Sequence, residues 1–353
     1  MMTILDTTIR DGSYAVDFKF TCGDIKNAVS KLVKLGIEYI EIGHGQGLNA
    51  SSPEHGISLC SDTEYLDAAM EVAGNAKIGM FCIPGIAQPE DIVSARTHGL
   101  SFVRIGVTVE NVDKALPYIE AAKNVGVIPM VNFMKTYIYS PDIFAEKALV
   151  AWQYGAAAIY MVDSAGCMLP NEITAYVTAI RNTSKEIKIG FHGHNKLGMA
   201  VANSLHCVEL GIDYIDCTFQ GLGRSIGNTS TEMFVMALKK KYGDKVCDID
   251  VPRLLEYGYV LLKDISPRRD IQNPLDLVCG YAGFHSGFQK YIFKCCEEKK
   301  VDPLRLIIAY SSENQESLDY KRLCEIAETL PRDDFEGHPY SFRQYFTSMY
   351  NDK

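Results

Sequence analysis

Short apolar segments alternate with longer amphipathic segments about eight times along the first part of the chain. Short apolar runs bounded by turn residues predict buried strands, and apolar residues at helical spacing predict helices packed on one face. The predicted strands are Thr3–Asp6, Ile37–Ile42, Lys77–Ile83, Phe102–Val107, Ile128–Met134, Ala158–Val162, Lys188–His192 and Tyr214–Thr218. The predicted helices are Asp24–Leu35, Asp62–Ala73, Pro89–His98, Val112–Val125, Asp142–Tyr154, Asn171–Asn182, Leu197–Leu210 and Thr229–Lys241.

Strict alternation of strand and helix predicts parallel strands joined by right-handed crossovers. Glycines such as Gly36, Gly126, Gly155 and Gly211 follow predicted helices, which is the usual stop signal at a helix C-terminus. Eight such units favour an α/β fold of the (β/α)8 TIM-barrel type. An open, doubly wound sheet is the alternative, but no GxGxxG motif follows the first strand.

The alternation stops near Val251, which divides the chain into three predicted parts. Residues 1–250 form the catalytic barrel, and residues 251–330 form a small C-terminal helical appendage. Residues 331–353 form a polar, aromatic tail. Prolines break the predicted helices of the appendage at Pro252, Pro267, Pro274 and Pro303.

The charge balance argues against nucleic acid and anionic membranes as partners. The formal net charge is −9, and the one basic cluster, Lys239–Lys241, ends a predicted helix as a solvated last turn. No apolar stretch approaches the ~20 residues of a membrane span. The first residues lack the basic and apolar regions of a signal peptide.

Cysteine usage predicts a reducing compartment. The chain has 11 cysteines, an odd number, and no CxxC motif. Scattered cysteines of this kind are typical of buried thiols in a reduced protein, so we expect a cytoplasmic location.

Polar residues at the predicted strand ends suggest a metal site. Arg10 and Asp11 follow the first strand, while His192 and His194 lie at the end of the seventh. The C-terminal ends of barrel strands form the active-site face, and two residues at i and i+2 on a strand point to the same side. Two imidazoles and one carboxylate leave coordination positions open for water and substrate, as a catalytic divalent ion requires.

Other strand ends carry polar groups with two interpretations each. The glycine-rich segment Gly221–Asn228 can cradle an anion with its backbone N–H groups, or it can simply form turns. Asn228 is either a helix N-cap or a fourth metal ligand. Ser164 either caps a helix or contacts substrate. His44, after the second strand, offers another polar side chain at the barrel mouth.

Together these motifs resemble the metal-dependent barrel lyases that carry RDG on the first strand and HxH on the seventh. That superfamily includes hydroxymethylglutaryl-CoA lyase, isopropylmalate synthase and the carboxyltransferase part of pyruvate carboxylase. Within it, the chain is most similar to the 4-hydroxy-2-oxovalerate aldolase family, from residue 4 to about residue 288. The resembling segments are Thr8–Ser13, Gly43–Leu48 with Ser51 and Ser52, Ile83–Ile86, Ile159–Ser164, His192–Asn195, Gly223–Asn228 and Gly280–Gly283.

The resemblance implies a pyruvate-type aldolase that cleaves or forms 4-hydroxy-2-oxo acids. It assigns Asp11, His192 and His194 as metal ligands, with Mn2+ as the usual ion and Mg2+, Co2+ or Zn2+ as alternatives. Arg10 matches the arginine that stabilises the pyruvate enolate. Ser164 and Tyr281 match positions near the small 2-oxo acid substrate.

One position departs from the family pattern. Where the aldolases carry a histidine base, this chain has Tyr14, and an unperturbed tyrosine with a pKa of about 10 is a poor base near neutral pH. Either Tyr14 acts with a lowered pKa beside the metal and Arg10, or His44 or His285 takes the proton. Phe81 and Ile83, at the end of the third strand, are expected to shape the aldehyde pocket.

Two other functions remain open at this point. One is a Claisen-type enzyme that condenses or cleaves acyl-CoA esters, and the other is an inactive barrel that serves as a binding subunit. Related aldolases pass their aldehyde to a dehydrogenase. The resemblance therefore suggests an aldehyde dehydrogenase partner or a homo-oligomer, with either one docking through the C-terminal helices.

Overall fold

Eight parallel strands close into a barrel in which each strand pairs with its neighbour in sequence and β8 pairs with β1. The computed structural model describes residues 2–265, 278–280 and 282–332. The strands are β1 (Thr3–Asp6), β2 (Tyr39–Ile42), β3 (Lys77–Cys82), β4 (Phe102–Val107), β5 (Ile128–Phe133), β6 (Ala158–Asp163), β7 (Ile189–Gly193) and β8 (Tyr214–Cys217). The predicted (β/α)8 fold is confirmed, with strand ends shifted by one or two residues.

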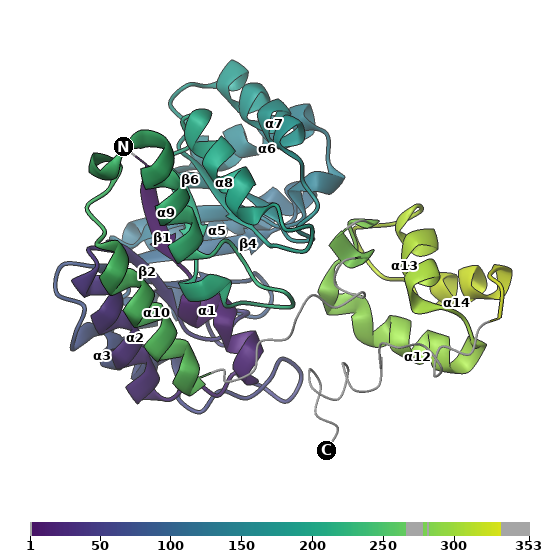
Figure 1. Cartoon of the computed structure of the whole chain (residues 1–353), viewed down its shortest axis with the longest axis horizontal. Coiled ribbons are helices and arrows are strands. Elements are labelled where there is room, and N and C mark those ends of the chain that lie inside the picture. The colour runs from purple at the N-terminus through teal and green to yellow at the C-terminus, as the bar shows by residue number, and fades with distance from the viewer. Residues whose placement is uncertain (1, 266–277, 281, 333–353) are drawn as a thin grey trace.

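Helices surround the barrel on its outside (Figure 1). These outer helices are α2 (Cys22–Lys34), α3 (Asp62–Met70), α4 (Pro89–Thr97), α5 (Leu116–Asn124), α6 (Pro141–Tyr154), α7 (Pro170–Thr183), α8 (Ala200–Glu209), α9 (Thr231–Tyr242) and α10 (Val251–Ile265). The short helix α1 (Thr8–Gly12) is instead buried at the barrel mouth. The predicted helix Val112–Val125 is divided into a 3-10 helix η2 (Val109–Ala115) and α5, which has a proline in its first turn. Helix α8 begins later than predicted, after Gly198 with its φ of +71°.

The barrel interior is built in layers from the even-numbered strands. Tyr39, Phe102, Ala158 and Tyr214 form an aromatic layer, with Tyr39 in contact with both Phe102 and Tyr214. Glu41, Arg104, Tyr160 and Asp216 follow two residues further along the same strands. This second layer is charged and completely buried, and it lies one step below the active-site face.

The C-terminal helices form a second body beside the barrel (Figure 1). Helices α12 (Gln289–Lys299), α13 (Pro303–Ser311) and α14 (Tyr320–Thr329) share a hydrophobic core with Cys279 and Phe284. We call residues 278–332 the C-terminal lobe, as far as the structure describes them. Of the predicted tail 331–353, residues 333–353 lie outside the described residues.

Helix α10 does not belong to the lobe, although the predicted boundary at residue 251 placed it there. Its buried residues Leu254, Leu261 and Leu262 are part of the core around the barrel, and the helix packs against α9 and α2. Its apolar stripe therefore completes the barrel, and the border between barrel and lobe falls after α10.

Two cysteines differ from the expectation of free thiols. Cys22, the first residue of α2, forms a disulfide with Cys60, which lies just before α3. The packing of α2 against α3 brings these two helix starts together. The other nine cysteines form no disulfide.

None of the helices that the structure describes is long and apolar enough to span a membrane.

Candidate active site

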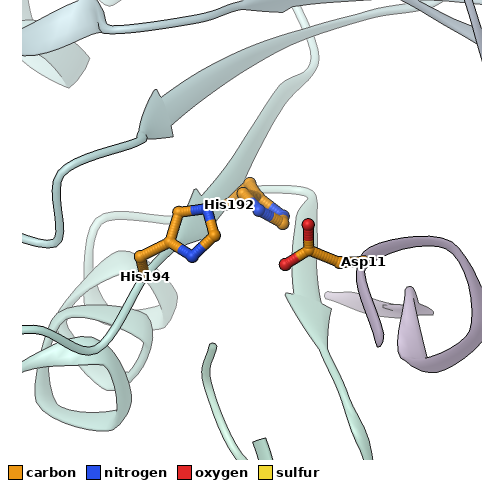
Figure 2. Close-up of side chains that lie close together, drawn as sticks. All are labelled: Asp11, His192 and His194. Atoms are coloured by element: carbon orange, nitrogen blue, oxygen red, sulfur yellow. The ribbon is translucent and has the colours of Figure 1, made fainter. Parts of the chain in front are cut away.

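Asp11, His192 and His194 come together at the mouth of the barrel. Their ligand atoms all lie within 4.8 Å of one another, and all three side chains are buried. Figure 2 shows the carboxylate of Asp11, at the end of a short helix, facing the two imidazoles from the end of β7. The two-residue spacing of the histidines puts both rings on the same side of the strand.

The protonation states of these groups suit a cation. Burial lowers the pKa of His194 to about 3, although Asp11 opposes the shift, so the imidazole is neutral. Burial alone would raise the pKa of Asp11, but Arg10, His194 and His192 together hold it well below its usual range. Neutral imidazoles and an ionised carboxylate are the forms that bind divalent metals.

Asn228 adds a second indication that an ion fits here. Its side-chain N–H donates to Asp11 Oδ2, and its Oδ1 is buried with no hydrogen-bond partner in the described part of the chain. A buried acceptor without a partner is rare and costs free energy, and a cation would satisfy it. The N-cap interpretation of Asn228 is wrong, because Ser230 caps α9. The fourth-ligand interpretation stays a prediction, and the donor set fits a divalent ion.

The carboxylate of Asp216 orients the ring of His192. Nδ1 of His192 lies 2.8 Å from Asp216 Oδ2, which leaves the other ring nitrogen for the ion. Asp216 in turn accepts a hydrogen bond from Arg104 Nη1. Such carboxylate–histidine pairs fix the tautomer and direction of a metal-binding ring.

Arg10 is held by carboxylates on two sides. Its Nε donates to Glu41 Oε2 at 2.8 Å, and its Nη1 donates to Asp11 Oδ1 at 2.9 Å. Phe81 supports the guanidinium, with its ring centroid 4.9 Å from Cζ. The arginine is therefore fixed beside the metal ligands before any substrate arrives.

Arg104 connects Glu41, which holds Arg10, with Asp216, which orients His192. It donates to both oxygens of Glu41, at 2.9 and 2.8 Å, as well as to Asp216. Burial would raise the pKa of Glu41, but Arg10 and Arg104 hold it at about 2. These three residues were not predicted from the sequence. The sequence did contain an indication of their role. Charged residues within otherwise apolar strands are costly to bury alone, which predicts that they pair with one another.

Tyr14 lies in the loop after β1, below the guanidinium of Arg224, whose Cζ is 4.5 Å from the ring centroid. Gly45 makes room for the ring, because a Cβ there would lie 2.4 Å from it. Burial raises the pKa of Tyr14, and Arg224 offsets only part of that shift. This direction is opposite to the lowered pKa expected from the sequence, so the phenol keeps its proton at neutral pH.

Both nitrogens of His44 already have partners. Nδ1 accepts from Gln46 N–H at 3.1 Å, and Nε2 lies 3.2 Å from Gly56 O. The ring is stacked on Phe18, and burial lowers its pKa to about 4. This geometry leaves no free lone pair for a base.

His285 begins the 3-10 helix η6 (Ser286–Phe288) in the lobe. Its Nδ1 accepts from Gly287 N–H at 3.1 Å. Burial lowers its pKa well below the usual range, and nearby cations including Arg224 add to the shift. A neutral ring with Nδ1 as acceptor carries its proton on Nε2, which makes it a donor toward the site.

The remaining expected residues are distributed around the mouth. Ser164 is buried, and its Oγ accepts from Lys135 N–H at 3.0 Å, which leaves its own hydroxyl hydrogen available. Ile83 is half-buried after β3, where its carbonyl accepts the N–H groups of a turn. Tyr281 lies outside the described residues.

Comparison with known proteins places the chain among related enzymes. The family model described as HMGL-like matches residues 1–257. An oxaloacetate decarboxylase of Mycobacterium tuberculosis is 35% identical over 283 residues, which cover 80% of this chain and 83% of that protein. A 4-hydroxy-2-oxovalerate aldolase of Roseiflexus castenholzii is 33% identical over 305 residues, which cover 86% of this chain and 90% of that protein.

Solved structures share the fold. The carboxyl transferase domain of pyruvate carboxylase from Rhizobium etli aligns with a TM-score of 0.73 and 16% identity, covering 96% of this chain and 62% of that one. The HMG-CoA lyase of Brucella melitensis aligns with a TM-score of 0.66 and 18% identity, covering 76% of this chain and 99% of that one.

Proposed function

This chain belongs to the HMGL-like family and is a metal-dependent carbon–carbon lyase, and we propose that it cleaves and forms 4-hydroxy-2-oxo acids through pyruvate. The observation that carries the proposal is the convergence of Asp11, His192 and His194 beside a fixed Arg10. Its relatives named 4-hydroxy-2-oxovalerate aldolase support the same reaction class.

Asp11, His192, His194 and Asn228 would hold the ion. When bound, a divalent metal acts as a Lewis acid toward the keto group of a 2-oxo acid. We propose Mn2+, because the oxygen ligands of Asp11 and Asn228 suit it and the family resemblance implies it, with Mg2+, Co2+ and Zn2+ as the ions to compare.

Arg10 stabilises the negative charge that develops on the enolate oxygen of pyruvate. Its guanidinium is already oriented by Glu41 and Asp11, so no reorganisation is needed as the charge appears. Ser164, with its free hydroxyl hydrogen, donates to the carboxylate of the substrate. Phe81 and Ile83 line the side where the aldehyde forms.

Tyr14 relays the proton in the aldol reaction. In cleavage, the proton of the 4-hydroxyl leaves, the C3–C4 bond breaks, and a proton is delivered to C3 to complete pyruvate. Because burial raises the pKa of Tyr14, the ionised phenol is scarce at neutral pH and aldol cleavage should speed up as the pH rises. We propose His285 as a substrate contact. Tyr281, which lies outside the described residues, is proposed as a further contact from the family resemblance alone.

Oxaloacetate decarboxylation is a second candidate. It is favoured by the raised pKa of Tyr14, which makes this residue a poor base at neutral pH. Loss of CO2 breaks the C3–C4 bond and yields the same enolate, but it has no hydroxyl proton to remove and needs no base. The relative named oxaloacetate decarboxylase, at 35% identity, supports this alternative.

One assay separates the candidates. Metal-stripped protein is reloaded with each ion, and pyruvate release is measured from 4-hydroxy-2-oxovalerate and from oxaloacetate. Consumption or formation of acyl-CoA esters is measured separately. Faster release from the hydroxy acid supports the aldolase, and faster release from oxaloacetate supports the decarboxylase. Dependence on a CoA ester would instead indicate a Claisen-type enzyme, and no turnover with any substrate would indicate a binding subunit.

Arg10→Lys tests the enolate chemistry common to both candidates. Lysine keeps the charge but loses the planar fork that Glu41 and Asp11 hold. We expect the turnover number to fall by ~10²–10³, the scale of losing one oxyanion donor, with metal content unchanged. Turnover close to that of the wild type would remove Arg10 from the mechanism.

We further propose that the lobe docks a partner, either an aldehyde dehydrogenase or a second copy of the chain. Tyr291 on α12 and Ile308 on α13 are large apolar side chains that the lobe leaves exposed. Light scattering of the purified protein, alone and with a dehydrogenase, distinguishes the two.

A further inference from the structure

Lys196 is a fully buried cation with few polar partners among the described residues. Lys196 is 1% exposed, and within the described part of the chain its ammonium makes one hydrogen bond, at 3.4 Å to the carbonyl of Phe284. An ammonium has three N–H donors. No carboxylate pairs with Lys196 in the part of the chain that the structure describes. Burying a charge without a partner costs several kcal/mol, so such a group calls for a compensating anion.

Arg224 approaches the same place from another loop. It is half-buried in the glycine-rich segment after β8, with its guanidinium over the ring of Tyr14. Its Nη2 lies 3.4 Å from the position that a Cβ on Gly287 would occupy. Among the described residues it has no carboxylate partner either.

Lys135 brings a third positive charge to this segment of the lobe. Its Nζ lies 4.9 Å from the ring centroid of Phe288 and donates to the main-chain carbonyl of Glu316. Three loops of the barrel mouth, after β5, β7 and β8, thus each direct a cation at residues 284–288. Burial lowers the pKa of His285, and all three cations add to that shift.

These charges are separate from the group that stabilises the enolate. Arg10 is neutralised by Glu41 and Asp11 and lies against Phe81 on β3, whereas Lys196 and Arg224 meet the lobe. The pyruvate half of the substrate already has Arg10 and the metal ligands. Lys196 and Arg224, which have no carboxylate partner among the described residues, are therefore available to bind the aldehyde half of the substrate.

We propose that Lys196 and Arg224 bind an anionic group, a carboxylate or a phosphate, carried by the aldehyde half of the substrate. This inference rests on the proposed aldolase function and narrows its substrate class. In the synthetic direction, the methyl carbon of pyruvate joins the aldehyde carbon. The aldehyde oxygen becomes the 4-hydroxyl by taking up a proton equivalent to the one that the methyl group lost.

The test compares matched aldehydes on the Mn2+-loaded, full-length enzyme. Succinic semialdehyde is paired with its neutral methyl ester, and glyceraldehyde 3-phosphate is paired with glyceraldehyde. For each pair, the ratio of kcat/KM with pyruvate measures the preference for an anion. The two pairs distinguish a carboxylate from a phosphate.

The variants Lys196→Met and Arg224→Met should each lower the anion preference about 10- to 100-fold, the usual effect of one charge-assisted hydrogen bond. Lys290→Met, on the exposed surface of α12 close to the same segment, is the matched control and should leave the ratio unchanged. A wild-type enzyme without anion preference, or a preference that survives both variants, would overturn the inference.

Two further measurements distinguish failure of this inference from failure of the proposed function, and a binding lysine from a structural one. Deuterium exchange at the methyl group of pyruvate reports enolisation alone. Without exchange the proposed function fails and the inference falls with it, whereas exchange without anion preference refutes only the inference. Lys196→Met should also raise the Tm of the ligand-free protein, because it removes a buried unpaired charge. A purely structural lysine would give a lower Tm.

Discussion

At the scale of single residues, the site is defined by which groups are charged before a ligand binds. His194 is neutral because burial lowers its pKa to about 3, while Asp11 stays ionised beside Arg10. A neutral His194 ring beside an ionised Asp11 carboxylate is the combination that binds a divalent metal.

Replacing His194 with alanine should remove the metal and abolish turnover without unfolding the chain. The ring has no structural hydrogen bond among those described, and residues at a barrel mouth serve function more than core packing. Metal content by mass spectrometry and circular dichroism check the two parts. His206→Ala, on the outer helix α8, is the control and should retain the ion. Full metal occupancy in the combined His192→Ala and His194→Ala variant would show that the ion binds elsewhere.

Tyr14 gives a second prediction, with a sign set by its pKa. A raised pKa means that ionised Tyr14 increases with pH, so aldol cleavage by the wild type should accelerate from neutral toward alkaline pH. Tyr14→Phe removes only the hydroxyl, and it should cost ~10²–10⁴ in rate and abolish that alkaline rise. Oxaloacetate decarboxylation by the same variant should change much less, because no base is needed. An unchanged profile for aldol cleavage would assign the proton transfer to another group.

At the scale of elements, side chains from the even-numbered strands connect Arg10 with His192. Arg104 on β4 holds Glu41 on β2 and Asp216 on β8, and these carboxylates orient Arg10 and His192. The layer below is aromatic and the layer above carries the site. One buried guanidinium thus fixes both the enolate-stabilising arginine and a metal ligand.

Arg104→Met should therefore destabilise the barrel by ~3–5 kcal/mol, because it leaves two buried carboxylates without their common partner. Urea unfolding measures this, with Arg322→Met as a control whose ion pairs are exposed and whose unfolding midpoint should barely move. A midpoint for Arg104→Met equal to that of the control would show that the layer contributes little.

The stability of the fold at acidic pH tests the buried layer of Glu41, Arg104 and Asp216 independently. The pKa of Glu41 is depressed to about 2 from an ordinary 4.5, so its ion pairs stabilise the fold above pH 4.5. That stability should be lost as the pH falls from 4.5 to 2. The loss in this window should be smaller in Arg104→Met, where one of the two cations beside Glu41 is gone.

The elements were largely predictable, because periodicity and glycine stops depend on local sequence. The convergence of Asp11, His192 and His194 was also predictable, since HxH at one strand end and RDG at another reach the same face in any parallel barrel. The partners of Arg104 were not. Glu41 and Asp216 are 175 positions apart in the chain, and only barrel closure brings both to Arg104. Similarly, nothing local in the sequence indicates that the lobe covers Lys196.

At the scale of the whole molecule, two separate cores meet over the site. The core around the barrel includes α10, whereas the lobe packs around residues such as Phe284 and Tyr310. Hydrogen bonds are among the described contacts between them. Lys196 bonds Phe284 O, and Tyr139 donates to Glu316 Oε1 at 2.9 Å. All the metal ligands come from the barrel, while the surroundings of the cations come from both bodies.

A chain ended after Ile265 should therefore keep its metal and its ability to enolise pyruvate, but lose discrimination between aldehydes. Without the lobe, Lys196 becomes exposed to water, which screens its attraction for an anion. The anion preference in kcat/KM should fall about 10- to 100-fold, as in Lys196→Met. Metal content, circular dichroism and pyruvate deuterium exchange establish that the barrel is intact before the ratio is measured. A truncated chain that is folded and metal-loaded yet keeps the full anion preference would show that the lobe does not form that part of the site. One that loses the ion would show that the lobe is needed to build the barrel mouth itself.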